Sequence, residues 1–129
     1  MSPLGLIAAN SVIRIGYGAA ALIAPSRPLL GRLSLAPDTE RFPEARLFVR
    51  GFAAHQIGVA IIGLASLSRP GLRRPAMLLS AATDLADIAS ALVEANVRGR
   101  LHSDLRDGIA FSSAGLVSAL AAVRGLAEE

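Results

Sequence analysis

The stretch GFAAHQIGVAIIGLASLS, residues 51–68, runs for eighteen residues without Asp, Glu, Lys or Arg. Most of its residues are Ala, Gly, Ile, Leu or Val, and they do not alternate with polar residues as in a half-buried strand. A helix that crosses the hydrocarbon core of a bilayer needs about 20 predominantly apolar residues. The stretch therefore predicts a membrane-spanning helix that begins near Pro43 and covers about residues 43–67.

Proline residues divide the rest of the chain into segments of similar kind. All seven prolines fall between apolar segments or near the first turn of one: 3, 25, 28, 37, 43, 70 and 75. Proline removes an amide donor and disrupts a helix interior, so we expect it at helix boundaries. The predicted helices cover about residues 3–24, 43–67, 74–97 and 104–125, within a single domain of residues 1–129. The last has an uncharged run of sixteen residues, 108–123, shorter than the eighteen of 51–68, and is predicted to span with local bilayer thinning or a tilt.

Composition agrees with a lipid environment. Hydrophobic residues make up 53% of the chain and charged residues 18%, below the roughly 25% of an average soluble domain. All thirteen basic residues are arginines and the net charge is only +3, so we expect no nucleic-acid partner. The chain has no cysteine, and its two histidines lie far apart without a ligand-spaced partner. We therefore predict no metal site and no cofactor.

Residue usage also bears on localisation. The absence of lysine and the abundance of Ala and Arg are typical of a GC-rich bacterial genome. The first apolar segment lacks a preceding Lys or Arg, and Pro25 follows where a cleavage site would need small residues. We therefore expect a retained first helix and a multi-pass protein of the bacterial cell (inner) membrane.

Polar residues form narrow stripes on the predicted helices. Asn10, Arg14 and Tyr17 follow i, i+4, i+7 spacing on the first helix, and Ser80, Asp84 and Asp87 share a face of the third. A soluble bundle would instead give each helix a broad polar face. The pattern predicts an all-α, four-helix transmembrane bundle, with the lipid bilayer as its outer partner and polar residues inside.

Arg14 lies at the middle of the first helix, where a charge is most costly. Translocon scales put a central arginine at roughly 2.5–3.5 kcal/mol. We therefore predict that Arg14 pairs with Asp84, Asp87 or both. One arginine does not neutralise two aspartates, so the surplus acid either carries a proton or faces Arg50.

Two interpretations of this cluster remain open at the level of sequence. In the functional one, Asp84, Asp87 and Arg14 form an acid–base or ion-binding site; in the structural one, they only hold the helices in register. His55 is either a proton shuttle or a histidine hydrogen-bonded to a neighbouring helix. The candidate binding residues are Asn10, Tyr17, Arg50, His55 and Gln56.

Small residues recur at close spacing, which allows helices to approach one another in lipid. The pairs are Gly16 and Gly18, Ala54 and Gly58, Gly108 and Ser112, and Ser118 and Ala122. Because the chain has few large aromatic residues, we expect its interfaces to be built this way. Some of these pairs could join protomers, so a homo-oligomer or a larger membrane complex is a further prediction.

Three segments stand out along the chain: the proline-terminated IRIGYGAAALIAP, the run RLFVRGFAAHQIGVAIIGL, and the aspartate in AATDLADIAS. With these segments the chain resembles the small four-helix bacterial membrane proteins of the DoxX-like and related families. His55 or Gln56 stands where relatives often carry Arg or Glu. The resemblance implies a membrane location and a four-helix fold over nearly the whole chain, and it implies little about chemistry.

Three hypotheses for function follow. The first is an accessory or interaction protein, or one that binds a lipophilic small molecule, with its Arg/Asp cluster serving structure or binding. The second is a membrane enzyme that uses Asp84 or Asp87 as acid and base and Arg14 to stabilise charge. Its reaction would be epoxide opening, cyclisation or isomerisation of a lipophilic substrate. The third is a small proton-coupled transporter with Asp84 or Asp87 as the proton carrier.

Overall fold

The computed structural model describes residues 1–23, 43–97, 99–101 and 103–128. In these ranges the chain forms four helices and no strand: α1 (Pro3–Ile23), α3 (Pro43–Leu67), α4 (Pro70–Val97) and α5 (Ser103–Ala127). The predicted all-α class is confirmed. Ala24, Pro25 and the rest of the first connection, as well as His102, lie outside the described residues.

The helix boundaries follow from local chemistry. Three helices begin at a proline, namely Pro3, Pro43 and Pro70. The first helical position needs no amide donor and suits the fixed φ of proline. Beyond the end of α4, Gly99 adopts a positive φ of 68° and its amide donates to the carbonyl oxygen of Asn96 (3.2 Å). Glycine takes up this backbone conformation without the cost that a side chain would add.

The third helix begins earlier than the sequence predicts. We expected it to start near Arg74, but α4 begins at Pro70 and contains Pro75 as its sixth residue. Pro75 lies so close to the beginning that it deprives only the Gly71 carbonyl of an intrahelical partner. Gly71 is exposed, so this carbonyl can be hydrated where the helix leaves the bilayer. At the same end, Arg73 Nη2 donates to the carbonyl oxygen of Leu67 (2.7 Å) and caps α3.

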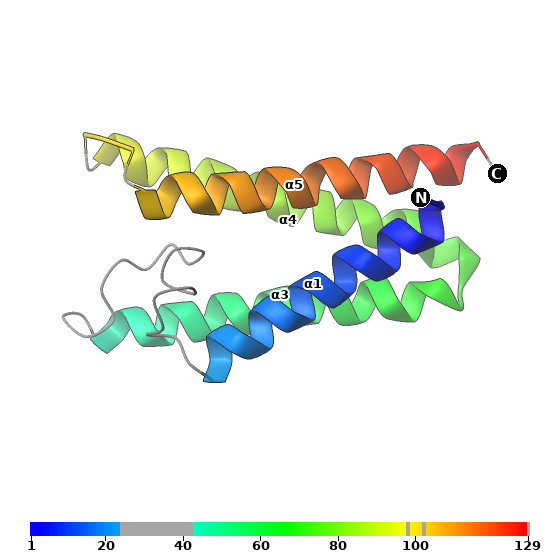
Figure 1. Ribbon diagram of the computed structural model, residues 1–129, viewed down its shortest axis with the longest axis horizontal. Coiled ribbons are helices and arrows are strands. Elements are labelled where there is room, and N and C mark those ends of the chain that lie inside the picture. Colours follow the sequence, from blue (N-terminus) through cyan, green and yellow to red (C-terminus); the bar gives the residue numbers. More distant parts are fainter. Residues whose placement is uncertain (24–42, 98, 102, 129) are drawn as a thin grey trace.

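The helices run alternately up and down, so both ends of the chain and the α3–α4 connection lie at the same end of the bundle (Figure 1). Each helix packs against its neighbours in chain order, and α1 closes the ring against α5. The α1–α3 and α4–α5 pairs are packed most closely, and the two pairs meet less closely. Consequently α1 and α4 face each other across the centre of the bundle.

All four helices are long and apolar enough to cross a membrane: Pro3–Ile23, Arg50–Leu67, Pro70–Val97 and Gly108–Ala127. The fourth span covers 20 residues, which is longer than the uncharged run 108–123 because it continues past Arg124. Large apolar side chains point outward along these spans; for example, Val12 is 60% exposed, Ile61 56% and Val117 68%. The chain is therefore a multi-pass membrane protein whose outer surface is compatible with acyl chains.

Small and polar residues occupy much of the interior. Buried alanines come from all four helices, and Ile7, Tyr17, Val59 and Met77 are the larger apolar side chains buried among the described residues. Helices approach most closely at glycine: a Cβ at Gly18 would lie 2.8 Å from the carbonyl oxygen of Ala53 on α3. The predicted role of Gly18 at an interface is confirmed. Gly58 faces outward with nothing within 4 Å of such a Cβ, so it does not contribute to packing within the chain.

Candidate functional site

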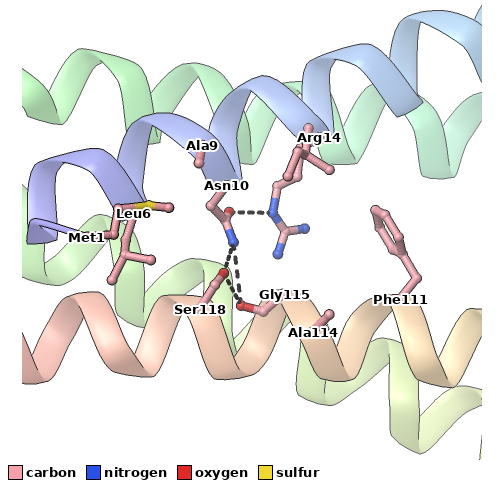
Figure 2. Close-up of a pocket in the computed structure, with 10 residues that line it drawn as sticks. Met1, Leu6, Ala9, Asn10, Arg14, Phe111, Ala114, Gly115 and Ser118 are labelled. Atoms are coloured by element: carbon pink, nitrogen blue, oxygen red, sulfur yellow. Dashed lines mark hydrogen bonds between the residues drawn. The ribbon is translucent and has the colours of Figure 1, made fainter.

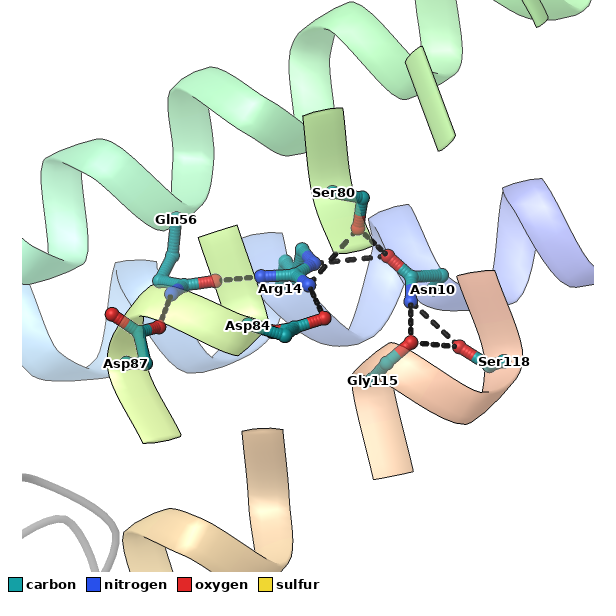
Figure 3. Close-up of polar contacts among 8 residues, drawn as sticks. All are labelled: Asn10, Arg14, Gln56, Ser80, Asp84, Asp87, Gly115 and Ser118. Carbon is teal, nitrogen blue, oxygen red and sulfur yellow. Dashed lines mark hydrogen bonds and ion pairs between the residues drawn. The ribbon is translucent and has the colours of Figure 1, made fainter. Parts of the chain in front are cut away.

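Arg14 lies at the centre of the bundle, and its guanidinium extends from α1 to the opposite helix α4 (Figure 3). Its Nη2 donates to Oδ2 of Asp84 at 2.5 Å and to Oγ of Ser80 at 3.0 Å. Its Nε donates to Oδ1 of Asn10 at 2.9 Å, and its Nη1 donates to Oε1 of Gln56. Arg14 is 2% exposed and Asp84 1%. A buried ion pair of this kind is tolerated because hydrogen bonds surround the charge.

Asn10 extends the network to α5. Its Oδ1 accepts hydrogen bonds from Arg14 Nε and from Ser80 Oγ (3.2 Å). Its Nδ2 donates to Oγ of Ser118 (2.7 Å) and to the carbonyl oxygen of Gly115 (3.4 Å). The Ser118 hydroxyl in turn donates to the same Gly115 carbonyl at 2.9 Å. With Gln56 on α3, the network joins all four helices through side chains that leave few polar atoms unsatisfied.

Gly115 allows the Asp84 carboxyl to lie directly against α5. A Cβ at position 115 would lie 2.6 Å from Asp84 Oδ2 and 3.0 Å from its Cγ and Oδ1. Any side chain here would displace the carboxyl from Arg14. The close α4–α5 packing and the position of the ion pair therefore both depend on glycine at this site.

The structure confirms the predicted pairing of Arg14 for one aspartate and not for the other. Asp87 does not contact the guanidinium; its Oδ2 accepts a hydrogen bond from Nε2 of Gln56 at 3.1 Å. Both Nη2 hydrogens of Arg14 already serve Asp84 and Ser80, and Gln56 lies between Arg14 and Asp87 (Figure 3). Sequence reasoning missed this bridge. Glutamine suits it because its amide accepts at the oxygen and donates at the nitrogen.

The remaining candidate residues are distributed around this network. Tyr17 is buried, and its ring packs edge-on against Phe52 (centroids 6.1 Å, 81° between the planes) and tilted against Phe111 (5.1 Å, 36°). His55 is exposed on the outer side of α3, since it is displaced by about 100° from the buried Gln56. Arg50 is exposed as well, and among the described residues no ion pair joins it to Asp87.

A cavity of about 370 Å³ lies between α1 and α5, beside the network (Figure 2). Asn10 and Arg14 line it from α1, and Gly115 and Ser118 line it from α5. The other described lining residues are apolar: Met1, Leu6, Ala9, Ile13, Phe111 and Ala114. Neither aspartate of the cluster is among the lining residues that the structure describes.

The cavity opens on the outer surface of the bundle. Ile13, one of its lining residues, is 58% exposed, and Ala114 on the opposite helix is also exposed. Both lie well inside the membrane spans of α1 and α5. The opening therefore faces the hydrocarbon region, where molecules dissolved in the bilayer can reach it.

Within the described ranges, no group of three or more His, Asp or Glu side chains is placed to hold a metal ion. Comparison with known protein families, curated proteins and solved structures found no match to the chain. What can be said of its function therefore depends on the geometry of the network and the cavity.

Proposed function

We propose that this protein binds a lipophilic small molecule in the cavity between α1 and α5. The observation that carries the proposal is the combination of an apolar cavity, open to the hydrocarbon region, with Asn10 and Arg14 in its wall. Small-molecule sites typically are apolar clefts of roughly 300–1,000 Å³ with a few polar groups that orient the ligand. The cavity falls at the small end of this range.

The polar network supports this function by holding Arg14 in one position. Four described residues accept hydrogen bonds from the guanidinium, so it is fixed before a ligand arrives. A prearranged donor loses little conformational entropy on binding. In this proposal Asp84 neutralises and orients Arg14, and the protein acts as an accessory or carrier protein of the membrane.

Several wider predictions belong to the same proposal. We propose a bacterial inner-membrane location and an affiliation with DoxX-like proteins, on the sequence features described above. We also propose that the outward-facing Ala54 and Gly58 of α3 are candidates for contacts with a second copy or a larger complex.

A cavity-filling variant tests the proposal. Ala114 lines the cavity and lies outside the polar network, so Ala114→Leu should reduce the space without breaking a hydrogen bond. Ala82 is exposed on α4, two residues from Asp84, and Ala82→Leu is a matched control away from the cavity. Purified proteins would be extracted with organic solvent, and the retained lipophilic molecules quantified by mass spectrometry.

We expect the wild-type protein and Ala82→Leu to retain the same molecule in near-stoichiometric amounts and Ala114→Leu to lose it. Equal retention by all three proteins, or retention of bulk lipid alone, would show that the cavity is not a ligand site. Circular dichroism of each preparation would verify that the helical content is unchanged.

A membrane enzyme that acts on a lipophilic substrate is the second candidate. The observation in its favour is Asp87, which is half-buried and, among the described residues, accepts one hydrogen bond, from Gln56. A carboxyl group with spare acceptor capacity can take up or release a proton. Asp87 is not among the described lining residues of the cavity, which makes binding the better-supported function. Conversion of the retained molecule by the wild-type protein and not by Asp87→Asn would favour the enzyme.

A further inference from the structure

The cavity wall contains few hydrogen-bond donors that remain for a ligand. Both Nδ2 hydrogens of Asn10 and the hydroxyl hydrogen of Ser118 are directed to partners on α5. A guanidinium carries five N–H groups, and four of those on Arg14 donate to described residues. Among the described polar side chains of the wall, the donor that remains is the second Nη1–H of Arg14.

In a bilayer, this donor influences which ligand the cavity binds more than the apolar wall does. Acyl chains are as apolar as Leu and Ile side chains, so a lipophilic molecule gains little by exchanging lipid for the cavity wall. A hydrogen bond to a charged group, in contrast, has no counterpart in the hydrocarbon region. The polar group at one end of the ligand, its head, therefore determines the affinity. The cavity volume limits the size of the ligand that can enter.

The charges around Arg14 determine the kind of head that fits. Arg14 and Asp84 form a buried pair without net charge, and Asp87 places a second carboxyl group beyond Gln56. An anionic head would add an unbalanced charge to a site of low dielectric constant, and it would lie near two carboxyl groups. A cationic head would be repelled by the guanidinium of Arg14. A hydrocarbon would leave the second Nη1–H of Arg14 without a hydrogen-bond acceptor.

We infer that the ligand is a lipophilic molecule with one uncharged acceptor oxygen, such as a ketone, aldehyde or ester carbonyl, that accepts a hydrogen bond from Arg14 Nη1. This inference rests on the proposed ligand-binding function. If each non-hydrogen atom takes up about as much space as a water molecule, roughly 30 Å³, the cavity holds about a dozen such atoms. The ligand's apolar part then lies along the lining residues Ile13 and Phe111 toward the opening.

Competition between molecules of one chain length tests this directly. The wild-type protein in lipid nanodiscs would be labelled with a diazirine-bearing twelve-carbon methyl ketone, and labelled residues located by mass spectrometry. The competitors are 2-dodecanone, dodecane, dodecanoate and dodecylamine. We expect labelling within the cavity lining and displacement by 2-dodecanone at a concentration about tenfold or more below that of the other three.

A variant separates the role of Arg14 from general lipophilicity. Arg14→Gln combined with Asp84→Asn removes both charges of the pair together, and we expect it to lose the preference for the ketone over dodecane. Should this variant fail to fold, the competition series on the wild-type protein still decides the question.

The outcomes distinguish the inference from the proposed function. Labelling of the cavity that all four competitors displace equally, or that dodecanoate displaces best, overturns the ligand class and leaves the cavity as a binding site. Labelling that Ala114→Leu does not reduce relative to Ala82→Leu overturns the ligand-binding function itself, and the inference with it.

Discussion

Replacement of Asp84 by asparagine should be among the most destabilising single changes in this protein. The asparagine side chain would retain an oxygen near Arg14 but would lack the negative charge that balances the guanidinium. Because both side chains of the native pair are nearly inaccessible and 2.5 Å apart, the arginine would remain charged in a site that water does not reach. Removal of one partner of a buried pair typically costs about 3–5 kcal/mol. We expect the free energy of unfolding to fall by about 3 kcal/mol or more.

Two further variants make this prediction specific to the observed pairing. Asp87→Asn preserves an acceptor for Gln56 and does not remove a partner of Arg14, so we expect a loss of about 1 kcal/mol. Adding Arg14→Gln to Asp84→Asn removes the unbalanced charge and should recover part of the loss, giving a positive coupling in the double-mutant cycle.

The assay is equilibrium unfolding in mixed micelles of increasing SDS content, followed by circular dichroism. A strictly additive double mutant, or an equal loss for Asp84→Asn and Asp87→Asn, would refute the reasoning. Such a result would mean that Arg14 does not depend on Asp84 in the folded protein.

Two other predictions concern close packing and lipid exposure. Gly115→Ala should lower the free energy of unfolding by about 1–3 kcal/mol, because its Cβ would displace the Asp84 carboxyl. Gly16→Ala is the matched control: nothing lies within 4 Å of the added Cβ, so this change should be neutral or stabilise the protein by up to about 1 kcal/mol. Equal changes in the free energy of unfolding for Gly115→Ala and Gly16→Ala, measured in the same assay, would contradict the close approach at Gly115. Val117 is 68% exposed at the middle of the α5 span, so Val117→Arg should reduce membrane insertion by roughly 2.5–3.5 kcal/mol in a glycosylation-mapping assay. Undiminished insertion would indicate that this face of α5 does not contact lipid.

Much of the architecture could be predicted from residue order alone. Segment length and the lack of charge predicted four spanning helices, and the boundaries of α3 were correct because Pro43 can begin a helix and Ser68 ends the uncharged run. The sequence places the beginning of α4 too late, near Arg74, because a proline such as Pro75 is expected at a helix boundary. A proline in the second turn of a helix costs little when the carbonyl that it leaves unpaired is exposed.

The candidate site could be predicted only in part. Helical spacing placed Asn10 and Arg14 on one face of α1, and Ser80 and Asp84 on one face of α4. The cost of an unpaired arginine in lipid then required an acid opposite to it. These are local or energetic arguments that need no tertiary structure, and they predict that Arg14 pairs with Asp84, Asp87 or both.

The choice between the two aspartates was decided by the tertiary structure. Asp84 and Asp87 lie one turn apart and look equivalent in the sequence. The position of α1 along the bundle axis relative to α4 puts Asp84 against the guanidinium, and Gln56 of α3 donates a hydrogen bond to Asp87. The cavity is likewise invisible in the sequence, because it arises where α1 and α5, the first and last helices, pack less closely than the pairs on either side. Sequence periodicity determines which side chains point inward. How far the helices slide and approach one another depends on the packing of all four together, at contacts such as Gly18 with Ala53 and Gly115 with Asp84.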